Sequence, residues 1–298
     1  MKKILVMGSI NIDISITAER MPNAGETVFG NSFETNIGGK GANQAVACGK
    51  LGGVVSMAAC TGFDDNGKIA AEYLSSVNVN TDYVFQKNGE TGSAVIVLSE
   101  GDNRIIVNKG TNGMFSTEDV DKYSQAIKNA DIIVFQLEIP VETVTYAAKL
   151  AKTMGKTVIL NPAPMANLPA ELLKNTDYII PNETEAQILT ETDAEPEVML
   201  NKIREIGVKN VIITLGDKGC IYNDGDTIKH HGIYKTDVVD TTAAGDTFIG
   251  ALSVYLAQDK PLDEAVDFAS LASAITVSRR GAGKSVPTLA DIKRSNLR

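Results

Sequence analysis

The sequence has few of the side chains on which many catalytic and metal sites depend. Of its 298 residues, two are histidine, three are cysteine and none is tryptophan. The histidines, His230 and His231, are adjacent, so a histidine-based triad or a multi-histidine metal site has almost nothing to draw on. The cysteines form no C-x-x-C pair and are odd in number, which argues against a disulfide framework and suits a reducing compartment.

Positive charge and long apolar runs are scarce as well. The chain has 28 Lys and Arg against 37 Asp and Glu, a formal charge of −9, which argues against a general binder of nucleic acid or of anionic membranes. No window approaches the ~18 apolar residues of a membrane span, and the first apolar run stops at Gly8, too early for a signal peptide. We therefore expect a cytoplasmic protein, in which any phosphate ligand is held by local groups.

Short apolar runs alternate with helical patterns along the whole chain. The runs predict buried strands at residues 4–7, 54–59, 132–137, 157–160, 178–180 and 211–214. Helices are predicted at residues 42–51, 68–77, 141–154, 183–190, 197–206, 245–257 and 262–278. Continuous hydrophobicity is typical of parallel strands that are covered on both faces. The strand–helix repetition therefore predicts a doubly wound α/β fold with a mainly parallel central sheet flanked by helices.

Two regions instead alternate apolar and polar residues. The first has Ile12, Ile14 and Ile16 followed by a strand expected at residues 28–33, and the second has strands expected at residues 93–99 and 104–107 around a hairpin-like connection, 100–103. Alternation predicts strands with one covered face. We expect one domain, residues 1–298, with a small protruding sheet formed by segments 12–35 and 92–110; this sheet is either a lid or a peripheral decoration.

A glycine-rich segment, Gly38-Gly39-Lys40-Gly41-Ala42-Asn43, precedes a predicted helix. Such a segment lets backbone N–H groups approach a ligand closely, and a helix N-terminus favours negative charge. Lys40 and Asn43 add a cation and an amide. Glycine-rich loops before helices are common, so this segment taken alone is a weak signal.

A second candidate lies near the C-terminus, where the turn Ala243-Ala244-Gly245 opens a predicted amphipathic helix. Unpaired N–H groups at such a turn would stabilise an anion, including charge that develops during group transfer. Asp246 lies in the first helical turn, where a carboxylate either accepts a proton from a bound hydroxyl or merely caps its helix. The scarcity of histidine favours Asp246 as the base.

Two further elements follow predicted strands. Residues 214–219 contain a Gly-x-x-Gly turn, which would either cradle phosphates or close a plain hairpin. Residues 181–185 follow another strand; Asn182 and Glu185 there would either lie beside phosphates or belong to an ordinary acidic first turn of a helix. Residues 281–285, Gly-Ala-Gly-Lys-Ser, look like the end of a P-loop, but the required first glycine is replaced by Ser278 and no buried strand precedes them.

In this order, the motifs resemble those of the ribokinase-like sugar kinases, the family that includes the B-type phosphofructokinases. Residues 38–43 match the N-terminal signature and residues 240–246, Asp-Thr-Thr-Ala-Ala-Gly-Asp, match the C-terminal one. The resemblance extends over essentially the whole chain and, with residues 8–13, is strongest to the ribose-specific members. It implies an ATP-dependent kinase that phosphorylates ribose at O5; deoxyribose, a nucleoside or a phosphorylated hexose are the alternative substrates.

The resemblance also implies roles for the matched residues. Asp246 would be the base, and Ala243, Ala244 and Gly245 would form the anion hole. The sugar would be bound by Asn11, Asp13, Gly39, Lys40, Gly41, Ala42, Asn43, Glu138 and Asp246. ATP would contact Asn182, Thr214, Leu215, Gly216, Asp217, Lys218, Gly219, Gly245, Asp246 and Ser270. Ser270 departs from the His or Asn often found beside adenine in the family.

Cofactors and assembly follow from the same resemblance. Mg²⁺ would be oriented through water by Glu185, and an activating K⁺ would be held, mostly by backbone carbonyls, at Asp240, Thr242, Thr276, Arg279, Gly281 and Ser285. The small sheet would also pair between two subunits of a homodimer. A non-catalytic sugar or nucleotide sensor is disfavoured because it needs no base. A dinucleotide-dependent oxidoreductase is disfavoured because no G-x-G-x-x-G follows the first strand.

Overall fold

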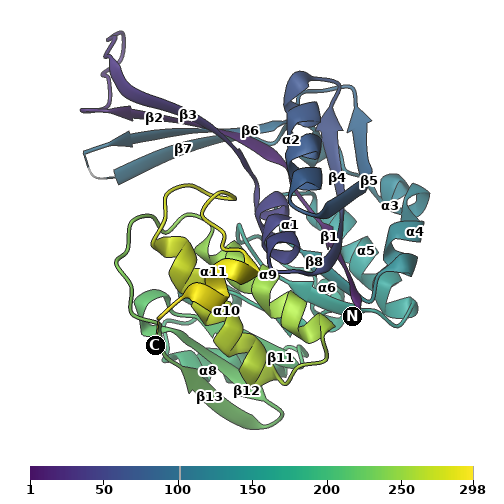
Figure 1. Ribbon diagram of the computed structural model, residues 1–298. Helices are drawn as coiled ribbons and strands as arrows, with labels where there is room; N and C mark the ends of the chain where they lie inside the picture. The colour runs from purple at the N-terminus through teal and green to yellow at the C-terminus, as the bar shows by residue number, and fades with distance from the viewer. Residues whose placement is uncertain (101, 298) are drawn as a thin grey trace.

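The computed structural model describes residues 1–100 and 102–297, and a nine-stranded sheet forms its centre (Figure 1). The strands are β1 (Lys3–Met7), β4 (Val54–Gly62), β5 (Val79–Lys87), β8 (Ile132–Phe135), β9 (Thr157–Leu160), β10 (Tyr178–Ile179), β11 (Asn210–Thr214), β12 (Cys220–Asp224) and β13 (Thr227–His231). Their order is β13-β12-β11-β10-β9-β8-β1-β4-β5. All neighbours pair in parallel from β11 to β5, whereas β12 and β13 are antiparallel. The predicted doubly wound, mainly parallel sheet is confirmed.

Helices cover both faces of this sheet. One face packs against α1 (Lys40–Lys50), α2 (Asp65–Ser76), α9 (Ala244–Ala257) and α10 (Leu262–Val277), with α11 (Leu289–Arg294) at its edge. The other packs against α3 (Thr117–Lys122), α4 (Ser124–Asn129), α5 (Val141–Thr153), α6 (Ala170–Lys174), α7 (Glu183–Thr190) and α8 (Pro196–Glu205). Strand β1 shows why its run is continuously apolar: Ile4 and Val6 enter the first core, and Leu5 and Met7 enter the second.

The order of the strands identifies the place where a ligand is expected. After β1 the chain builds β4 and β5 on one side, and then it crosses to β8 on the other side of β1. The loops that leave the carboxyl ends of β1 and β8 therefore diverge. In open α/β sheets the crevice at such a switch point is the usual ligand site.

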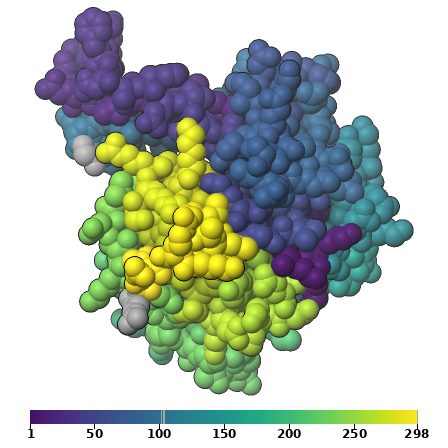
Figure 2. Space-filling view, in the orientation of Figure 1, coloured from purple at the N-terminus to yellow at the C-terminus, as the bar shows by residue number. Residues whose placement is uncertain are grey.

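The small sheet stands away from the body of the molecule (Figures 1 and 2). It consists of β2 (Asn11–Ala18), β3 (Gly30–Gly38), β6 (Gly92–Ser99) and β7 (Asp102–Asn108) in the order β3-β2-β6-β7. The prediction of a separate small sheet is confirmed. The strand expected at residues 28–33 was misplaced, because β3 pairs with β2 through its backbone as far as Gly38, where the side chains are mostly polar. In the predicted connection 100–103, Gly101 lies outside the described residues.

Several elements had no clear pattern in the sequence. Strand β5 is an edge strand of mixed polarity, and β12 and β13 form an antiparallel hairpin at the other edge, so none of the three is a continuous apolar run. Helix α2 begins three residues before its predicted start because Asp64 caps it by accepting a hydrogen bond from the N–H of Gly67. None of the helices in the described ranges combines the length and apolarity that a bilayer crossing requires.

Candidate active site

The loops at the switch point are held together by Glu138, which follows β8. Its Oε2 accepts hydrogen bonds from Ser9 Oγ at 2.5 Å and from the backbone N–H of Lys40, the first residue of α1, at 2.9 Å. Helix α1 starts against β1 because Gly41 has no side chain: a Cβ there would lie 2.5 Å from the backbone nitrogen of Ser9. The glycine-rich segment therefore brings a helix N-terminus and Lys40 to the crevice.

The small sheet contributes two polar side chains at the base of β2. Asn11 Oδ1 accepts from Asn112 Nδ2 at 2.8 Å, and Asn112 also binds the N–H and the carbonyl of Ile10. Asp13 lies against Gly38, where an added Cβ would be 2.0 Å from its Oδ2. Burial and the nearby carboxylates of Glu138 and Asp246 raise the pKa of Asp13 to about 6.

Asp246 lies in the first turn of α9 and is 8% exposed. Its Oδ2 accepts from Asn43 Nδ2 and its Oδ1 from Gln44 Nε2, both at 3.0 Å. The N-cap position of α9 is Ala243, in the left-handed region with φ 60°, and no side chain caps the helix. Asp246 is thus turned toward α1 and is not a capping carboxylate. Gly245 beside it is exposed. The N–H of Ala244 already donates to the carbonyl of Thr241 at 3.2 Å, so the N–H groups of Gly245 and Asp246 are the ones at this helix start that could meet a ligand.

Charges of opposite sign converge around Asp246. Burial raises the pKa of its carboxyl, and Glu138 adds to this, whereas Lys40 and the hydrogen bonds from Gln44 and Asn43 oppose it. Burial disfavours the charged form of Lys40, but Asp246, Glu138 and Glu185 outweigh burial and raise the pKa of its ammonium group. Lys40 is therefore charged and is set among three carboxylates that come from different parts of the chain.

Asn182 and Glu185, which are predicted to contact ATP and the water around Mg²⁺, form a capping box at the start of α7. Asn182 Oδ1 accepts from the N–H of Glu185 at 2.8 Å, and Glu185 Oε2 accepts from the N–H of Asn182 at 2.9 Å. Burial raises the pKa of Glu185, and the backbone hydrogen bond and Lys40 oppose the shift. Asn182 and Glu185 therefore do form an ordinary acidic first turn of a helix. Glu185 also faces Lys40 and Asp246 across the crevice.

The predicted phosphate loop, residues 214–219, lies next to Asn182. A parallel bridge joins Asn182 to Thr214, and the loop contains a short 3₁₀ helix, η2 (Gly216–Lys218). It also connects β11 to β12, so it closes a hairpin as well. Ser270 lies on α10 close to Cys220 of β12. The loop thus follows the carboxyl end of β11, and Asn182 follows the adjacent strand β10.

The residues predicted to hold a monovalent cation connect two loops. Asp240 Oδ1 accepts from the N–H and the hydroxyl of Thr242 at 2.9 and 2.6 Å, and its Oδ2 accepts from the N–H of Gly281 at 2.9 Å. Asp240 thus joins the turn before α9 to the loop after α10. The hydroxyls of Thr276 and Ser285 bond within the protein, to Ala272 and Ala282 carbonyls.

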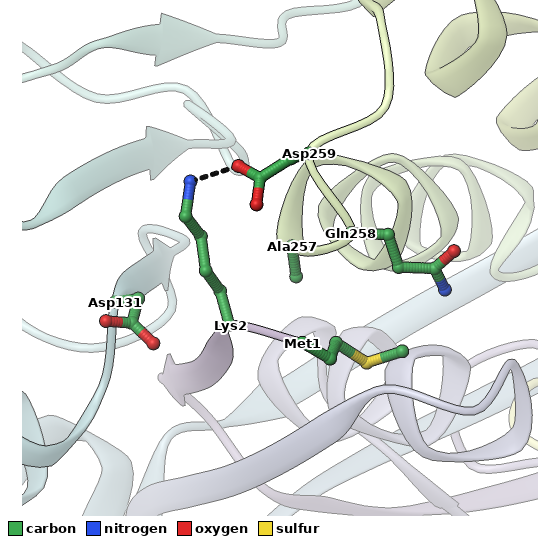
Figure 3. A pocket seen from close by; sticks show the side chains of 6 residues that line it. All are labelled: Met1, Lys2, Asp131, Ala257, Gln258 and Asp259. Carbon is green, nitrogen blue, oxygen red and sulfur yellow. Dashed lines mark hydrogen bonds and ion pairs between the residues drawn. The ribbon is translucent and has the colours of Figure 1, made fainter.

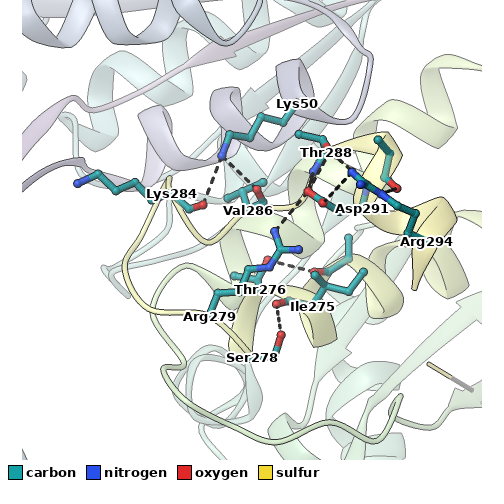
Figure 4. A network of polar contacts seen from close by, with 12 residues as sticks. Lys50, Ile275, Thr276, Ser278, Arg279, Lys284, Val286, Thr288, Asp291 and Arg294 are labelled. Atoms are coloured by element: carbon teal, nitrogen blue, oxygen red, sulfur yellow. Dashed lines mark hydrogen bonds and ion pairs between the residues drawn. The ribbon is translucent and has the colours of Figure 1, made fainter. Parts of the chain in front are cut away.

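The loop after α10 is held from two sides (Figure 4). Arg279 turns its guanidinium toward Asp291 of α11, at 3.3 Å, and so offers only its backbone to a cation. Lys50, at the end of α1, donates to the carbonyl of Val286 at 3.1 Å (Figure 4) and to that of Gly283 at 2.8 Å. Burial and the positive charge of Arg279 lower the pKa of Lys50. The residues predicted to hold the cation would offer it the carboxylate of Asp240 and backbone carbonyls, and oxygen ligands are the kind that a hard cation prefers.

Several polar residues at the site were not identified from the sequence. They are buried and bind other site residues: Ser9, Gln44, Asn112, Gln136 and Asn161. One signal was present, because Gln136 interrupts the apolar run predicted as the strand 132–137. The strand ends at Phe135, and Gln136 turns toward Gln44.

A surface depression lies at the opposite end of the sheet (Figure 3). It is lined by Met1, Lys2, Asp131, Ala257, Gln258 and Asp259. Lys2 forms an ion pair with Asp259 at 2.5 Å, at the amino end of β1. Because the crevice at the switch point is at the carboxyl ends of the strands, this depression does not belong to the candidate site.

Comparisons with known proteins agree with this geometry. The model of the pfkB family of carbohydrate kinases matches residues 1–289. A ribokinase of Schizosaccharomyces pombe is 40% identical over 98% of this chain and 97% of its own, and a deoxyribokinase of Salmonella typhimurium is 35% identical over 96% of both. The structure of Arabidopsis thaliana ribokinase complexed with ribose and ATP superposes with a TM-score of 0.93 at 35% identity, covering 98% of each chain.

Proposed function

The chain belongs to the pfkB family of carbohydrate kinases, and from this premise we propose that it transfers the γ-phosphoryl group of ATP to O5 of D-ribose, giving ribose 5-phosphate. The observation that supports this most strongly is Asp246, a buried carboxylate at the start of α9, placed across from the amides and carboxylates of β2 and α1. Whole-chain similarity to ribokinases supports ribose as the sugar.

The proposed sugar pocket matches a polyol chemically. Each sugar hydroxyl needs a donor and an acceptor partner, and Asn11, Asp13, Asn43 and Glu138 offer both kinds. Lys40 and the backbone of residues 39–42 would complete the pocket. Apart from Lys40, no basic side chain occurs at residues 8–13 or 38–43 to meet a second phosphate. A phosphorylated hexose is therefore a poorer candidate than a pentose.

The proposed reaction is an in-line transfer in which Asp246 takes the proton of the 5-hydroxyl and the hydroxyl oxygen forms the new bond to phosphorus. Both oxygens of Asp246 accept N–H hydrogen bonds, which favours the carboxylate that a base requires. The turn Ala243-Ala244-Gly245 would form the anion hole that stabilises the charge on the transferring group. Positioning and electrostatic stabilisation supply most of such catalysis.

The described residues fit the two cations of the proposal. Glu185 has its second oxygen, Oε1, available for water around Mg²⁺, which would neutralise phosphate charge. Asp240, with the carbonyls of residues 242, 276, 279, 281 and 285, would hold K⁺ beside the turn that precedes α9. Because Asp240 already joins that turn to residue 281, K⁺ there would keep the turn in place without touching substrate.

We expect ADP release to depend strongly on ribose and to increase with K⁺. The measurement is a coupled assay across ribose, deoxyribose, fructose, fructose 6-phosphate and adenosine, each with K⁺ and with Na⁺ at equal ionic strength. A higher kcat/KM for deoxyribose than for ribose would identify deoxyribose as the substrate. Equal rates in K⁺ and Na⁺ would contradict the K⁺ site. Absence of turnover on every sugar by a folded protein would overturn the kinase proposal itself.

We further propose that the small sheet is a lid over the sugar and that its outer face pairs with a second copy of the chain. Register places Ile14, Val95 and Ile106 side by side on one face, with Ile16 and Phe33 on the same face. Phe33 is 66% exposed and Ile106 75% exposed. Asp13 points to the opposite face, toward the crevice, so pairing of the outer faces leaves the sugar pocket free.

The expected oligomer is a homodimer in the cytoplasm, where the three buried, unpaired cysteines would remain reduced. Size-exclusion chromatography with light scattering should give twice the mass of the chain. Ile106→Asp should yield monomers, because it places a charge in the apolar face, whereas Val198→Asp, a change at an exposed residue of α8, should not. A wild-type protein that is strictly monomeric would contradict the dimer.

A further inference from the structure

A chain of buried amides lies behind Asp246. Gln136 Nε2 donates to Gln44 Oε1 at 2.6 Å, and Gln44 Nε2 donates to Asp246 Oδ1 at 3.0 Å and to Asn161 Oδ1 at 3.3 Å. Asn161 Nδ2 in turn donates to the carbonyl of Ile180 at 3.1 Å. Gln44 and Gln136 are fully buried, and Asn161 is 6% exposed. Helix α1 and the ends of β8 and β9 are thus linked to the proposed base.

The orientation of every amide in this chain follows from its two ends. An ionised Asp246 only accepts hydrogen bonds, and so does the carbonyl of Ile180. Gln44 must therefore present its NH₂ group to Asp246, and Asn161 must present its NH₂ group to Ile180 and its oxygen to Gln44. Both hydrogens of Gln44 are then in use, and Gln136 is the donor to its oxygen. Gln44 cannot reverse without losing these bonds.

At the far end of the chain of amides, Gln136 has one buried polar atom that is left unpaired. Gln136 Oε1 is buried and has no hydrogen-bond partner among the described residues. It is packed against Gly8, where an added Cβ would lie 1.9 Å from it. A buried acceptor without a partner is destabilising, and an apolar side chain of similar size would avoid the loss. The stability of the fold alone therefore does not explain why a glutamine occupies position 136. Its hydrogen bond to Gln44, which fixes the orientation of that amide, does explain it.

We propose that Gln44 is a positioning residue for catalysis: held by Gln136 and Asn161, it orients the Asp246 carboxylate and stabilises its charged form. This inference rests on the proposed function, in which Asp246 is the base. Asn43, the neighbour of Gln44, binds the other oxygen of Asp246 and would face the sugar. Gln44 acts from the protein side and would not touch substrate.

The direction of the effect follows from the charges around the base. The groups that face Asp246 are Lys40 of α1, Glu138 after β8, Asp13 of β2 and Glu185 of α7. Loss of the Gln44 N–H leaves these in place and removes one interaction that lowers the pKa of Asp246. The base would then be protonated up to a higher pH, so the acid limb of kcat/KM would move upward.

The test is the pH profile of kcat/KM for ribose in the Gln44→Leu protein. Hydrogen bonds to charged groups are strong enough to move a pKa by roughly one to two units, so we expect an upward shift of that size in the acid limb. The KM for ATP should change less than about twofold, because Gln44 is fully buried behind Asp246 and would not itself touch ATP. Gln136→Leu should shift the limb in the same direction by a smaller amount.

A matched control is Asn223→Leu. Asn223 is another buried amide, which accepts from the N–H of Val211 at 2.8 Å and donates to the carbonyls of Lys209 and Gly225, in the β11–β12 hairpin. Its loss should lower the free energy of unfolding without moving the acid limb. A structural role for Gln44 would likewise destabilise the protein and leave the limb in place.

An unchanged acid limb in a folded Gln44→Leu protein would overturn the inference. If that variant does not fold, the profile of Gln136→Leu decides in the same way. If the wild type phosphorylates no sugar, the proposed function fails separately. The pKa of Asp246 can then be obtained from the pH dependence of unfolding, by comparison with Asp246→Asn. An equal pKa in the wild-type and Gln44→Leu proteins would then overturn the inference.

Discussion

Asp246→Asn is expected to lower ribose-dependent ADP release by about 10²–10⁴-fold, the range that a general base contributes. The asparagine has nearly the same shape, but it cannot accept a proton from the sugar hydroxyl. One of its oxygens is also replaced by an NH₂ group, which would face the NH₂ of Asn43 or of Gln44. The loss should therefore appear in kcat, while ATP binding, measured by calorimetry, stays close to that of the wild type.

Asp259→Asn is the matched control, because Asp259 follows the other end of α9. It is exposed, pairs with Lys2 and has φ 57°, a conformation that asparagine tolerates. Its activity should be normal. Near-normal turnover by the Asp246→Asn protein would remove Asp246 from the role of base, and loss of ATP binding would show that the change had disturbed more than the proton transfer.

Lys40→Met is expected to reduce kcat/KM for ribose by about 10²–10³-fold, the effect of removing one preorganised electrostatic partner. Lys40 lowers the pKa of both Asp246 and Glu185. Without its charge, both pKa values rise further above their ordinary range, so a smaller fraction of the base is ionised near neutral pH. The acid limb of the profile should move to higher pH, and part of the activity should return as the pH is raised.

The control for this change is Lys260→Met, which removes an exposed lysine that pairs with Glu264 on α10. It should alter neither kcat/KM nor the acid limb, because the interaction is at the surface and screened by solvent. A Lys40→Met protein whose rate falls by the same factor at every pH would contradict the electrostatic part of the argument. Lys40 would then act through contact with the ligand alone.

Much of the candidate site could be predicted from local sequence patterns. The turn of residues 243–245 and Asp246 were recognised because small residues followed by a carboxylate open an apolar-faced helix, and the structure places Asp246 in that first turn. The glycine-rich segment was recognised for a similar reason, and Gly41 does meet the backbone of Ser9. Short-range patterns of this kind are readable because the helix start and the residue that uses it are adjacent in sequence.

The amide chain could not be predicted in this way. Gln44 is separated from Gln136 by 92 residues and from Asp246 by 202 residues, and no sequence pattern indicates that these side chains meet. The residue range of β3 also differs from the predicted one, because the pairing of β3 depends on the backbone of β2 more than on its own side chains. In both cases the deciding contact is made with another segment, so no local pattern within the residues concerned could indicate it.

The sequence alone determined the fold class, through continuous apolar runs that only a covered parallel sheet can bury. It also determined which functional groups the site can contain, namely carboxylates and one lysine, because histidines are scarce. Tertiary structure alone decided how those groups act on one another. The switch point between β1 and β8 brings Lys40, Glu138 and Asp246 together. Burial and neighbouring charges there shift the pKa values of Lys40 and Asp246, because the energy of a charge depends on its neighbours in space.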